Sequence, residues 1–459
     1  MSFGDLLHRV GGMGRFQIIH VTLLCIPILL MASHNLLQNF SAAIPDHKCK
    51  LNDTGPSNTS TEQEGWVKMF APLDSKGKPD SCLEFVELQW RKVTGNVSWD
   101  NMTAVGTRQC LAGWDYDRTE FSSTIITEWD LVCMHKNRRQ LAQSIYMAGV
   151  LVGAIILGGL SDKYGRRALL IWSYLQMAVC GTCTAFSPNY LSYCIFRFLV
   201  GMALSGIGLN TTALIVEWIP TRERTITGTL AGFCYTVGQL LLAGLAYGIR
   251  DWRWLQLTVS LPFVFYFLYS WWFPESARWL VISGRPDKAV TEIKKVSRIN
   301  GKAEEGEKIT LETLKADMIK EVACGTETYT LLDLVRTSTV RRISFAVSLV
   351  WFSTSFAYYG LAMDLQKFGV SIYLIQVIFG AVDFPAKLVS TTSMIYIGRR
   401  VTQACSLILG GLAILANIFV PNELQTVRTS LAVFGKGCLA ASFSCIFLYT
   451  TELYPTVIR

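Results

Sequence analysis

Long apolar segments alternate with short polar turns along most of this 459-residue chain. Each segment is about 20 residues long, the length that an α-helix needs to cross a hydrocarbon core of about 30 Å. We expect about ten such helices, near residues 16–37, 140–160, 168–187, 190–213, 225–248, 255–273, 343–363, 371–395, 401–420 and 427–450. The pattern predicts an all-α membrane protein.

Two polar landmarks occur twice in the chain. The sequence GGLSDKYGRR ends at Arg167, and SMIYIGRR ends 233 residues later at Arg400. EWIPTRER ends at Arg224, and ELYPTVIR ends 235 residues later at Arg459. Nearly equal offsets indicate a duplicated unit and therefore two pseudo-symmetric helical bundles, the architecture of secondary transporters.

The second copy of this repeat is shorter than the first. Two apolar segments follow Arg224, whereas none follows Arg459. We therefore expect six spans in the first bundle and four in the second, as in a splice product or an incomplete gene. Such a truncated form would leave its cavity wall open to lipid, so we expect low or absent transport activity unless another chain completes it.

Three regions follow from the pattern. They are residues 1–279, the first bundle with a polar loop at 38–139; residues 280–342, a linker; and residues 343–459, the incomplete second bundle. Within the linker, apolar residues at helical spacing predict short amphipathic helices at Pro286–Arg298 and Thr310–Glu321. Glu304–Glu307 between them predicts a solvated turn.

Lysine and arginine residues gather at one end of the predicted spans. They lie between the second and third spans, the fourth and fifth, the eighth and ninth, and throughout the linker. Because positive residues favour the cytosolic side, this end and both termini are predicted to be cytosolic. The loop 38–139 is then extracellular, as in a multi-pass protein of the plasma membrane.

The loop 38–139 carries the chemistry of an oxidising compartment. Its sequons predict glycosylation at Asn52, Asn58, Asn96 and Asn101. Asn39 also begins a sequon but lies close to the membrane, and Asn210 lies inside a span, where we expect no modification. Four of the 13 cysteines lie in this loop, and their even number predicts two disulfides with three possible pairings among Cys49, Cys82, Cys110 and Cys133.

Small residues recur at helical spacing on two predicted spans. Gly149 and Gly153 lie four residues apart on the second span, and Gly228 and Gly232 lie four apart on the fifth. This spacing predicts close helix crossings at both places.

Composition narrows the class of function. Apolar residues make up 51% of the chain and charged residues only 17%, which is too apolar for an ordinary soluble protein. The net charge of +8 comes from runs beside the spans, so it does not indicate nucleic-acid binding. No phosphate-binding loop, metal-ligand motif or nucleophile motif is present. We expect a carrier rather than an enzyme, with no cofactor and no metal.

The turn GGLSDKYGRR resembles the signature loop of the major facilitator superfamily. In that family its aspartate, here Asp162, meets the start of helix 11 and latches the cytosolic gate. The segment PESARWL after the sixth span resembles the sugar-porter signature PESPRWL. Together with the repeated landmarks, these resemblances imply structural or gating roles for Asp162, Arg166, Arg167, Glu217, Arg222, Glu275, Arg278, Asp383, Glu452 and Arg459.

The extracellular loop narrows the family further. GWDYD at 113–117 and SSTIITEWDLVC at 122–133 look like the organic ion transporters of solute carrier family 22. The resemblance extends over essentially the whole chain. It implies a polyspecific carrier for small organic ions that works by alternating access, with exchange of an external organic anion for an internal dicarboxylate.

Three basic side chains lie inside predicted spans, where ionisable residues are costly and commonly functional. Lys387 follows Asp383 by four residues, a spacing that allows an ion pair. Either Asp383 neutralises Lys387 structurally, or Lys387 attracts an organic carboxylate; the anion branch of the family carries lysine here, which favours anions. Lys436 is assigned equally to structure and to substrate attraction, and Arg197 to packing.

Aromatic residues supply flat walls that suit polyspecific binding of aromatic anions. Any one of them taken alone is better explained by packing. The family resemblance implies substrate-binding roles for Asn35, Tyr235, Trp351, Tyr358, Tyr359, Lys387, Lys436, Phe443 and Phe447. Phe443 and Phe447, four residues apart, are expected to share a helix face. Gly208 departs from relatives, which carry a serine there that is implicated in chloride binding.

The leading interpretation is a carrier for small organic anions in the lipid bilayer, with a dicarboxylate as counter-substrate and no nucleic-acid partner. One alternative is a carrier for organic cations or zwitterions, which charge reversal at Lys387 would distinguish. Another is a non-transporting regulator that associates with a full-length relative.

Overall fold

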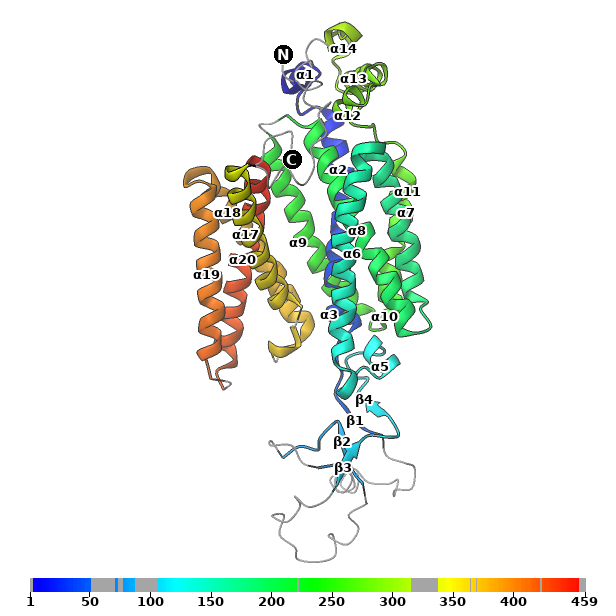
Figure 1. Cartoon of the computed structure of the whole chain (residues 1–459), viewed down its shortest axis with the longest axis vertical. Coiled ribbons are helices and arrows are strands. Elements are labelled where there is room, and N and C mark those ends of the chain that lie inside the picture. Colours follow the sequence, from blue (N-terminus) through cyan, green and yellow to red (C-terminus); the bar gives the residue numbers. More distant parts are fainter. Residues whose placement is uncertain are drawn as a thin grey trace, which may run out of the picture.

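The computed structural model is a bundle of long helices with a small region of strands at one end (Figure 1). Nine helices in the described part of the chain are long and apolar enough to cross a membrane, which confirms an all-α membrane fold. The structure describes residues 3–50, 71–72, 77–86, 106–220, 223–314, 337–363, 365–368, 370–421 and 423–453.

The long helices fall into two sets that lie beside each other. The first set comprises α2 (Arg15–Leu36), α6 (Asn137–Tyr164), α7 (Arg166–Ala185), α8 (Tyr190–Trp218), α9 (Arg224–Gly248), α10 (Trp252–Ser260) and α11 (Pro262–Ser270). The second set comprises α17 (Ser338–Ala362), α18 (Ile372–Tyr396), α19 (Arg399–Phe419) and α20 (Gln425–Leu453). In Figure 1 the second set is coloured yellow to red and the first blue to green.

The predicted span at 255–273 is divided into two short helices. α10 ends at Ser260 and α11 begins at Pro262. Proline has no N–H to donate and its ring clashes with the preceding turn, so the helical hydrogen-bond ladder is interrupted there. Neither piece reaches 18 residues, which is why nine long helices are found where ten spans are predicted.

The two ends of the bundle carry different elements (Figure 1). At the linker end lie α1 (Phe3–Arg9), α12 (Ala277–Ile282), α13 (Pro286–Ile299) and α14 (Ala303–Glu307). At the strand end lie α3 (Gln38–Ser41), α5 (Ile125–Trp129) and the four strands. These names are used for the two ends below.

The linker region agrees with the sequence in part. The predicted helix at Pro286–Arg298 is confirmed as α13. The predicted turn at Glu304–Glu307 is wrong, because α14 forms there with two glutamates in its first turn, where the helix dipole favours negative charge. The predicted helix at Thr310–Glu321 extends beyond the described residues, which end at 314 in this stretch.

The duplicated landmark has the same local structure in both copies. Gly165 and Gly398 adopt positive φ angles of 103° and 99°. Glycine tolerates this conformation because it has no β-carbon. Arg166 and Arg399 follow, and each donates from Nη1 to the carbonyl five residues before it, at 3.2 Å in both copies. The sequence repeat is therefore a repeat of turn geometry.

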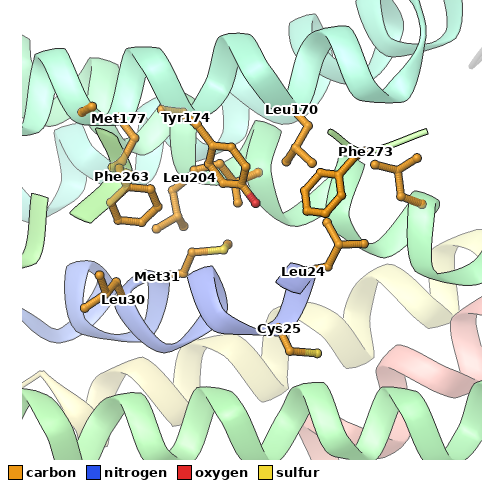
Figure 2. Packing of buried hydrophobic residues seen from close by; sticks show 14 of the residues in the cluster. Leu24, Cys25, Leu30, Met31, Leu170, Tyr174, Met177, Leu204, Phe263 and Phe273 are labelled. Carbon is orange, nitrogen blue, oxygen red and sulfur yellow. The ribbon is translucent and has the colours of Figure 1, made fainter. Parts of the chain in front are cut away.

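The core of the first set is built on α2. Figure 2 shows Leu24 and Met31 projecting from α2 toward Tyr174, Phe263 and Phe273, which come from α7, from α11 and from the residues just after α11. All five side chains are at most 9% exposed. Because lipid tails are as apolar as these side chains, close van der Waals packing rather than burial from water stabilises such contacts within a membrane.

The crossing of α6 and α8 brings two backbones into contact. A β-carbon at Gly153 would lie 2.6 Å from the Cα atom of Met202. A β-carbon at Gly149 would meet the carbonyl of Phe198, and one at Gly201 would meet the carbonyl of Tyr146. The close crossing predicted from Gly149 and Gly153 is confirmed.

The second predicted crossing is wrong. A β-carbon at Gly228 would meet only a side-chain atom of Leu448 at 4.0 Å, and one at Gly232 would meet only the side chain of Lys387, from 3.8 Å. The close approach of α9 is instead at Gly238, where a β-carbon would meet the carbonyl of Leu29 in α2. Spacing identifies a row of small residues, but it does not decide which row faces a neighbour.

The strand end is held by two small sheets and two disulfides. β1 (His47–Cys49) pairs antiparallel with β4 (Trp114–Tyr116), and β2 (Leu83–Phe85) pairs antiparallel with β3 (Thr107–Gln109). Cys49 is bonded to Cys110, and Cys82 to Cys133. The two predicted disulfides are confirmed, and one of the three pairings is selected.

The sequons divide into two groups. The predicted glycosylation sites at Asn52, Asn58, Asn96 and Asn101 lie outside the described residues. Asn39 is 2% exposed and donates to the carbonyl of Ala362 at 2.8 Å. Asn210 is 1% exposed and accepts from Ser161 at 2.5 Å. In the folded protein both of these amides are therefore buried and hydrogen-bonded.

Substitution of Gly153 by alanine should destabilise the protein. The added β-carbon meets backbone rather than a movable side chain, so α6 and α8 must separate, and overpacking of this kind costs about 1–3 kcal/mol. Thermal unfolding of the detergent-solubilised protein measures the effect. Gly159→Ala on the same helix is the control, because nothing lies within 4 Å of its β-carbon position. Equal melting temperatures for the two variants would contradict the crossing.

Candidate ligand-binding site between the two helical sets

A polar seam joins α9 of the first set to α18 of the second. Thr229 lies 3.4 Å from Thr391 through their hydroxyl oxygens. Further along α9, Gln239 donates to Asp383 Oδ2 at 3.1 Å. Partner numbers fall on α18 as they rise on α9, so the two helices run antiparallel. The seam is the principal polar contact between the two sets among the described residues.

Lys387 lies in the middle of this seam. Its Nζ donates to the carbonyl of Gly232 at 2.7 Å and to Thr236 Oγ1 at 2.6 Å. The absence of a side chain at Gly232 gives the lysine room to lie against α9. Lys387 is 8% exposed, and its Nζ lies 5.8 Å from the ring centre of Tyr235. Both of its hydrogen-bond acceptors are neutral.

Of the two alternatives for Lys387, structural neutralisation by Asp383 is wrong. The ammonium of Lys436 on α20 lies 2.9 Å from Asp383 Oδ1 and 3.1 Å from Oδ2, and both side chains are 1% exposed. Lys436 can approach both carboxylate oxygens from the neighbouring helix, whereas Lys387 extends from its own helix toward α9. Asp383 therefore neutralises Lys436, and within the described residues Lys387 forms no ion pair.

The buried pair is surrounded by hydrogen bonds and aromatic faces. Lys436 Nζ lies 4.2 Å from the ring centre of Tyr358 and 6.0 Å from that of Phe379. Gln239 donates to Asp383 and also, at 3.4 Å, to the Tyr358 hydroxyl. A buried ion pair needs such additional partners because its desolvation is costly.

Four aromatic rings form a cluster between α17 and α20. Phe443 contacts Trp351, Tyr358 and Tyr359 at centroid separations of 5.7, 5.1 and 6.5 Å. Tyr358 and Tyr359 also contact each other, at 5.5 Å. Trp351 is fixed by donation from its Nε1 to Thr450 Oγ1 at 2.9 Å. The structure thus brings four of the five predicted aromatic residues of these two helices together.

Phe447 does not share the face of Phe443. It is 46% exposed and has no contact with the other rings among the described residues. Phe352 and Phe356 stack on each other at 5.8 Å and are 66% and 73% exposed. These side chains lie on the outer surface, where packing against lipid explains them. Helical spacing alone therefore did not decide that Phe443, and not Phe447, packs against the other rings.

Asn35 and Tyr235 form part of a chain of hydrogen bonds. Tyr146 donates from its hydroxyl to Asn35 Oδ1 at 2.9 Å, and Asn35 Nδ2 donates to the Tyr235 hydroxyl at 3.2 Å. The guanidinium of Arg197 lies over the Tyr146 ring, 4.2 Å from its centre. The chain links α8, α6, α2 and α9, and it ends beside Lys387.

A second group of charged residues lies at the linker end. Arg166 Nη2 lies 2.8 Å from Asp162 Oδ1, and Arg166 Nε lies 3.5 Å from Glu217 Oε1. The Asp162 side chain is 77% exposed, so it is not the buried centre of this group. Trp279 donates from Nε1 to the carbonyl of Asp162 at 2.8 Å. The motif therefore contacts α12 through its backbone.

The carboxylate of Glu275, a residue just before α12, binds the first turn of α7. Its Oε1 accepts from the backbone N–H of Arg166 at 3.1 Å and of Arg167 at 3.2 Å. Arg167 also donates to the carbonyl of Trp271. Burial raises the pKa of the Glu275 carboxyl above its usual value, and the backbone N–H donors act in the opposite direction. Helix N-termini favour carboxylates, and here the carboxylate is Glu275 rather than Asp162.

The remaining predicted gating residues are less defined. Arg278 lies in the first turn of α12 and is half-buried. Arg222, Arg459 and the side chain of Glu452 lie outside the described residues. Their proposed roles stay predictions.

The residues of the seam, and of the hydrogen-bond chain that ends beside it, that were missed from the sequence are polar and uncharged. Thr236, Gln239 and Tyr146 are all fully buried. Gln239, as an amide inside an apolar span, could have been found from the sequence. Tyr146 and Thr236 could not, since tyrosine and threonine are common in membrane helices and only the fold gives them their partners.

A groove formed by α18 and α20 lies elsewhere. It has a volume of about 590 Å³, is lined mainly by apolar residues of α18 and α20, and reaches the beginnings of both helices, at Val370 and Gln425. None of the residues that line it is one of the predicted substrate-binding residues. The charged seam, rather than this groove, is therefore the candidate site.

Comparison with known proteins gives concordant results. Residues 101–459 match the family described as "Sugar (and other) transporter". Over its full length the chain is 76% identical to Solute carrier family 22 member 6-A of Xenopus laevis, 58% to Solute carrier family 22 member 6 of Danio rerio and 54% to that of Oryctolagus cuniculus, and it covers 82% of each. Such identity over such lengths identifies a transporter rather than an enzyme.

Solved structures give the same fold. The partially occluded inward-open form of the xylose transporter XylE from E. coli has a TM-score of 0.59 at 14% identity, over 95% of this chain and 87% of that one. The inward-open form has a TM-score of 0.60, over 96% and 84%. Identity this low supports the architecture alone.

Loss of the Lys436 charge should destabilise the fold. In Lys436→Met the Asp383 carboxylate is left buried without a counter-charge, which costs about 3–5 kcal/mol. The double variant Asp383→Asn with Lys436→Met should recover most of the loss, since no buried charge remains. Thermal unfolding of the three proteins measures this. A Lys436→Met protein as stable as the parent would show that the pair is not formed.

Glu275 should matter more for stability than the motif aspartate. Glu275→Ala removes the acceptor for two N–H groups at the start of α7, a loss of about 0.5–2 kcal/mol, and Glu275→Gln should lose less because one oxygen remains. Asp162→Ala is the matched control, since it breaks only an exposed ion pair. A larger loss of melting temperature in Asp162→Ala would reverse the assignment.

Proposed function

The chain belongs to the sugar and other transporter family and, within it, to solute carrier family 22, and from this premise we propose that it carries small organic anions by alternating access. The single observation that carries the anion assignment is Lys387. Its ammonium is buried between the two helical sets and contacts only neutral oxygen atoms. A buried cation without a counter-charge is costly, and a carboxylate from a ligand would supply that charge.

Lys387 also gives binding a route to movement. It projects from α18 of the second set and holds Gly232 and Thr236 of α9 in the first set. An arriving carboxylate competes with these two neutral acceptors for the ammonium. The hydrogen bond from the ammonium to a charged carboxylate is stronger than one to a neutral oxygen. Binding therefore weakens the central contact between the sets, which favours their relative motion. This coupling is what alternating access requires.

The aromatic cluster supplies the part of the site that is not charged. Tyr359, Trp351 and Phe443 are half-buried, unlike the fully packed Phe379. Rings at this depth offer flat apolar faces to an aromatic anion and do not require one exact shape. Lys436 contributes less to attraction, because Asp383 already neutralises it. We assign it to the stability of α18 against α20.

The linker end is proposed to be cytosolic, and the strand end to be outside a plasma membrane. Lysine and arginine residues are concentrated at the linker end, as expected for a cytosolic face. Disulfides at the strand end fit an oxidising compartment. On this assignment Arg166, Glu217 and Glu275 form a cytosolic clamp between α7, α8 and the segment before α12 that gates the inner side.

We extend the proposal to exchange. Each time the site empties, Lys387 returns to its two neutral acceptors on α9. Return of the empty carrier would be slowed by the re-formed tether, so a second anion on the return path accelerates turnover. A small dicarboxylate fits this role by charge.

Substitution at Lys387 tests the anion assignment. Lys387→Met should weaken binding of an aromatic monocarboxylate by roughly 10- to 100-fold, since a hydrogen bond to a charged group is worth about 1.5–3 kcal/mol. Lys387→Arg keeps the charge and should retain most of the affinity, whereas Lys387→Glu should reject the anion. Ligand-induced stabilisation of the purified protein gives the affinities, and uptake of the labelled acid gives transport.

The matched control is Lys163, an exposed lysine at the linker end. Lys163→Met should bind the acid as the parent does. The assignment to anions would be overturned if Lys387→Met bound the acid as tightly as the parent, or if the parent bound organic cations in place of the acid.

A further inference from the structure

Arg197 on α8 is a buried arginine without a counter-charge. It is 1% exposed, and within the described residues its Nε and Nη1 have no hydrogen-bond partner. Its Nη2 reaches Gln143 Oε1 only at 3.4 Å. The guanidinium also lies over the face of Tyr146, 4.2 Å from the ring centre. A packing role alone does not explain why a guanidinium is kept at such a position, since an apolar side chain would pack without the desolvation cost.

The contact between Arg197 and Tyr146 bears on the hydrogen-bond chain that begins at the Tyr146 hydroxyl. The phenol donates to Asn35 Oδ1, and Asn35 Nδ2 donates to the hydroxyl of Tyr235. Every bond in the chain therefore points from Arg197 toward Tyr235. The hydroxyl of Tyr235 accepts from Asn35, so its own proton is not used within the chain.

The direction of this chain could in principle be reversed by turning the Asn35 amide. Tyr235 would then donate to Asn35, and Tyr146 would accept. The hydroxyl proton of Tyr146 would then have no acceptor in the guanidinium of Arg197, which offers only donors. In addition, a positive charge over the ring makes the phenol a stronger donor and a weaker acceptor. Arg197 thus favours the direction in which Tyr146 donates.

The end of the chain borders the proposed site. The Nζ of Lys387 lies 5.8 Å from the ring centre of Tyr235, and the Tyr235 side chain is half-buried rather than enclosed. A carboxylate held by Lys387 would have a second oxygen available for the Tyr235 hydroxyl.

We propose that Arg197 is a positioning residue that fixes the direction of the Tyr146–Asn35–Tyr235 chain, so that the Tyr235 hydroxyl is a donor to the same carboxylate that Lys387 binds. The inference rests on the proposed function, because it needs an anion at Lys387. It adds a specific role for a cation that does not itself touch the ligand. It also explains why Asn35, an amide with both a donor and an acceptor, connects the two tyrosines.

A double-substitution cycle tests the chain. Tyr235→Phe should weaken binding of an aromatic monocarboxylate by about tenfold, the value of one hydrogen bond to a charged group. Arg197→Met should weaken it by a similar factor, and the double variant should lose no more than either single variant. Affinity is measured on purified protein by ligand-induced stabilisation, separately from the melting temperature without ligand. Arg197→Lys keeps a positive charge over Tyr146 and should restore most of the affinity.

Two further variants separate positioning from folding. Tyr146→Phe keeps the ring under the guanidinium but removes the first donor, so it should lose affinity as Arg197→Met does, even if Arg197→Met fails to fold. Arg253→Met is the matched control, because Arg253 also lies over a ring, that of Trp252 at 4.7 Å, but contacts Glu128 outside the chain. It should change stability without changing affinity.

The outcomes are distinct. If Arg197→Met and Tyr146→Phe bind the acid as tightly as the parent while Lys387→Met does not, the chain is not oriented by Arg197 and this inference fails alone. If the losses in Arg197→Met and Tyr235→Phe are additive, the two residues act independently and it also fails. If Lys387→Met binds as tightly as the parent, the proposed function itself is wrong.

Discussion

A buried charge must be matched, and this constraint organises the middle of the molecule. Two lysines and one aspartate lie where α9, α18 and α20 meet, and all three are at most 8% exposed. Asp383 can neutralise only one lysine, and its carboxylate forms the ion pair with Lys436. Lys387 is left with a carbonyl and a hydroxyl. On the proposed function, this remaining positive charge attracts the anion, and its position between the helical sets couples binding to movement.

The rest of the fold supports this arrangement through contacts of a different kind. Within the first set, α6 and α8 cross with backbones touching at Gly149, Gly153 and Gly201, so this part is rigid. Between the sets, a buried apolar cluster packs α9 against α18, with Leu242 and Ala246 on one side and Ile375 and Phe379 on the other. Beside this cluster Lys387 is held by two hydrogen bonds that a ligand can replace. We therefore expect each helical set to move as a rigid body when the Lys387 contact is exchanged. Closely packed helices have few intermediate arrangements, so they do not deform gradually.

The two ends of the bundle are held by separate devices. At the linker end Glu275 binds the first turn of α7 and Arg166 reaches toward Glu217, which ties α6, α7, α8 and the segment before α12 together. At the strand end the disulfides Cys49–Cys110 and Cys82–Cys133 close the loop that follows α3. Neither device involves the central seam. The contact between Lys387 and α9 can therefore open without a change in the contacts at either end of the bundle.

The sequence by itself determined the spans, the duplicated turn and the presence of two disulfides, because these depend on length, composition and local chain conformation. A stretch of apolar residues must be a helix in lipid, and Gly165 and Gly398 mark the same turn whatever surrounds them. Only the tertiary structure decided which helix faces meet. It paired Asp383 with Lys436 and brought Gly238, rather than Gly232, against α2. It also placed the Glu275 carboxylate at the start of α7 and left Phe447 exposed. Each of these depends on which face of one helix meets which face of another, and helical spacing leaves that choice open until several helices pack at once.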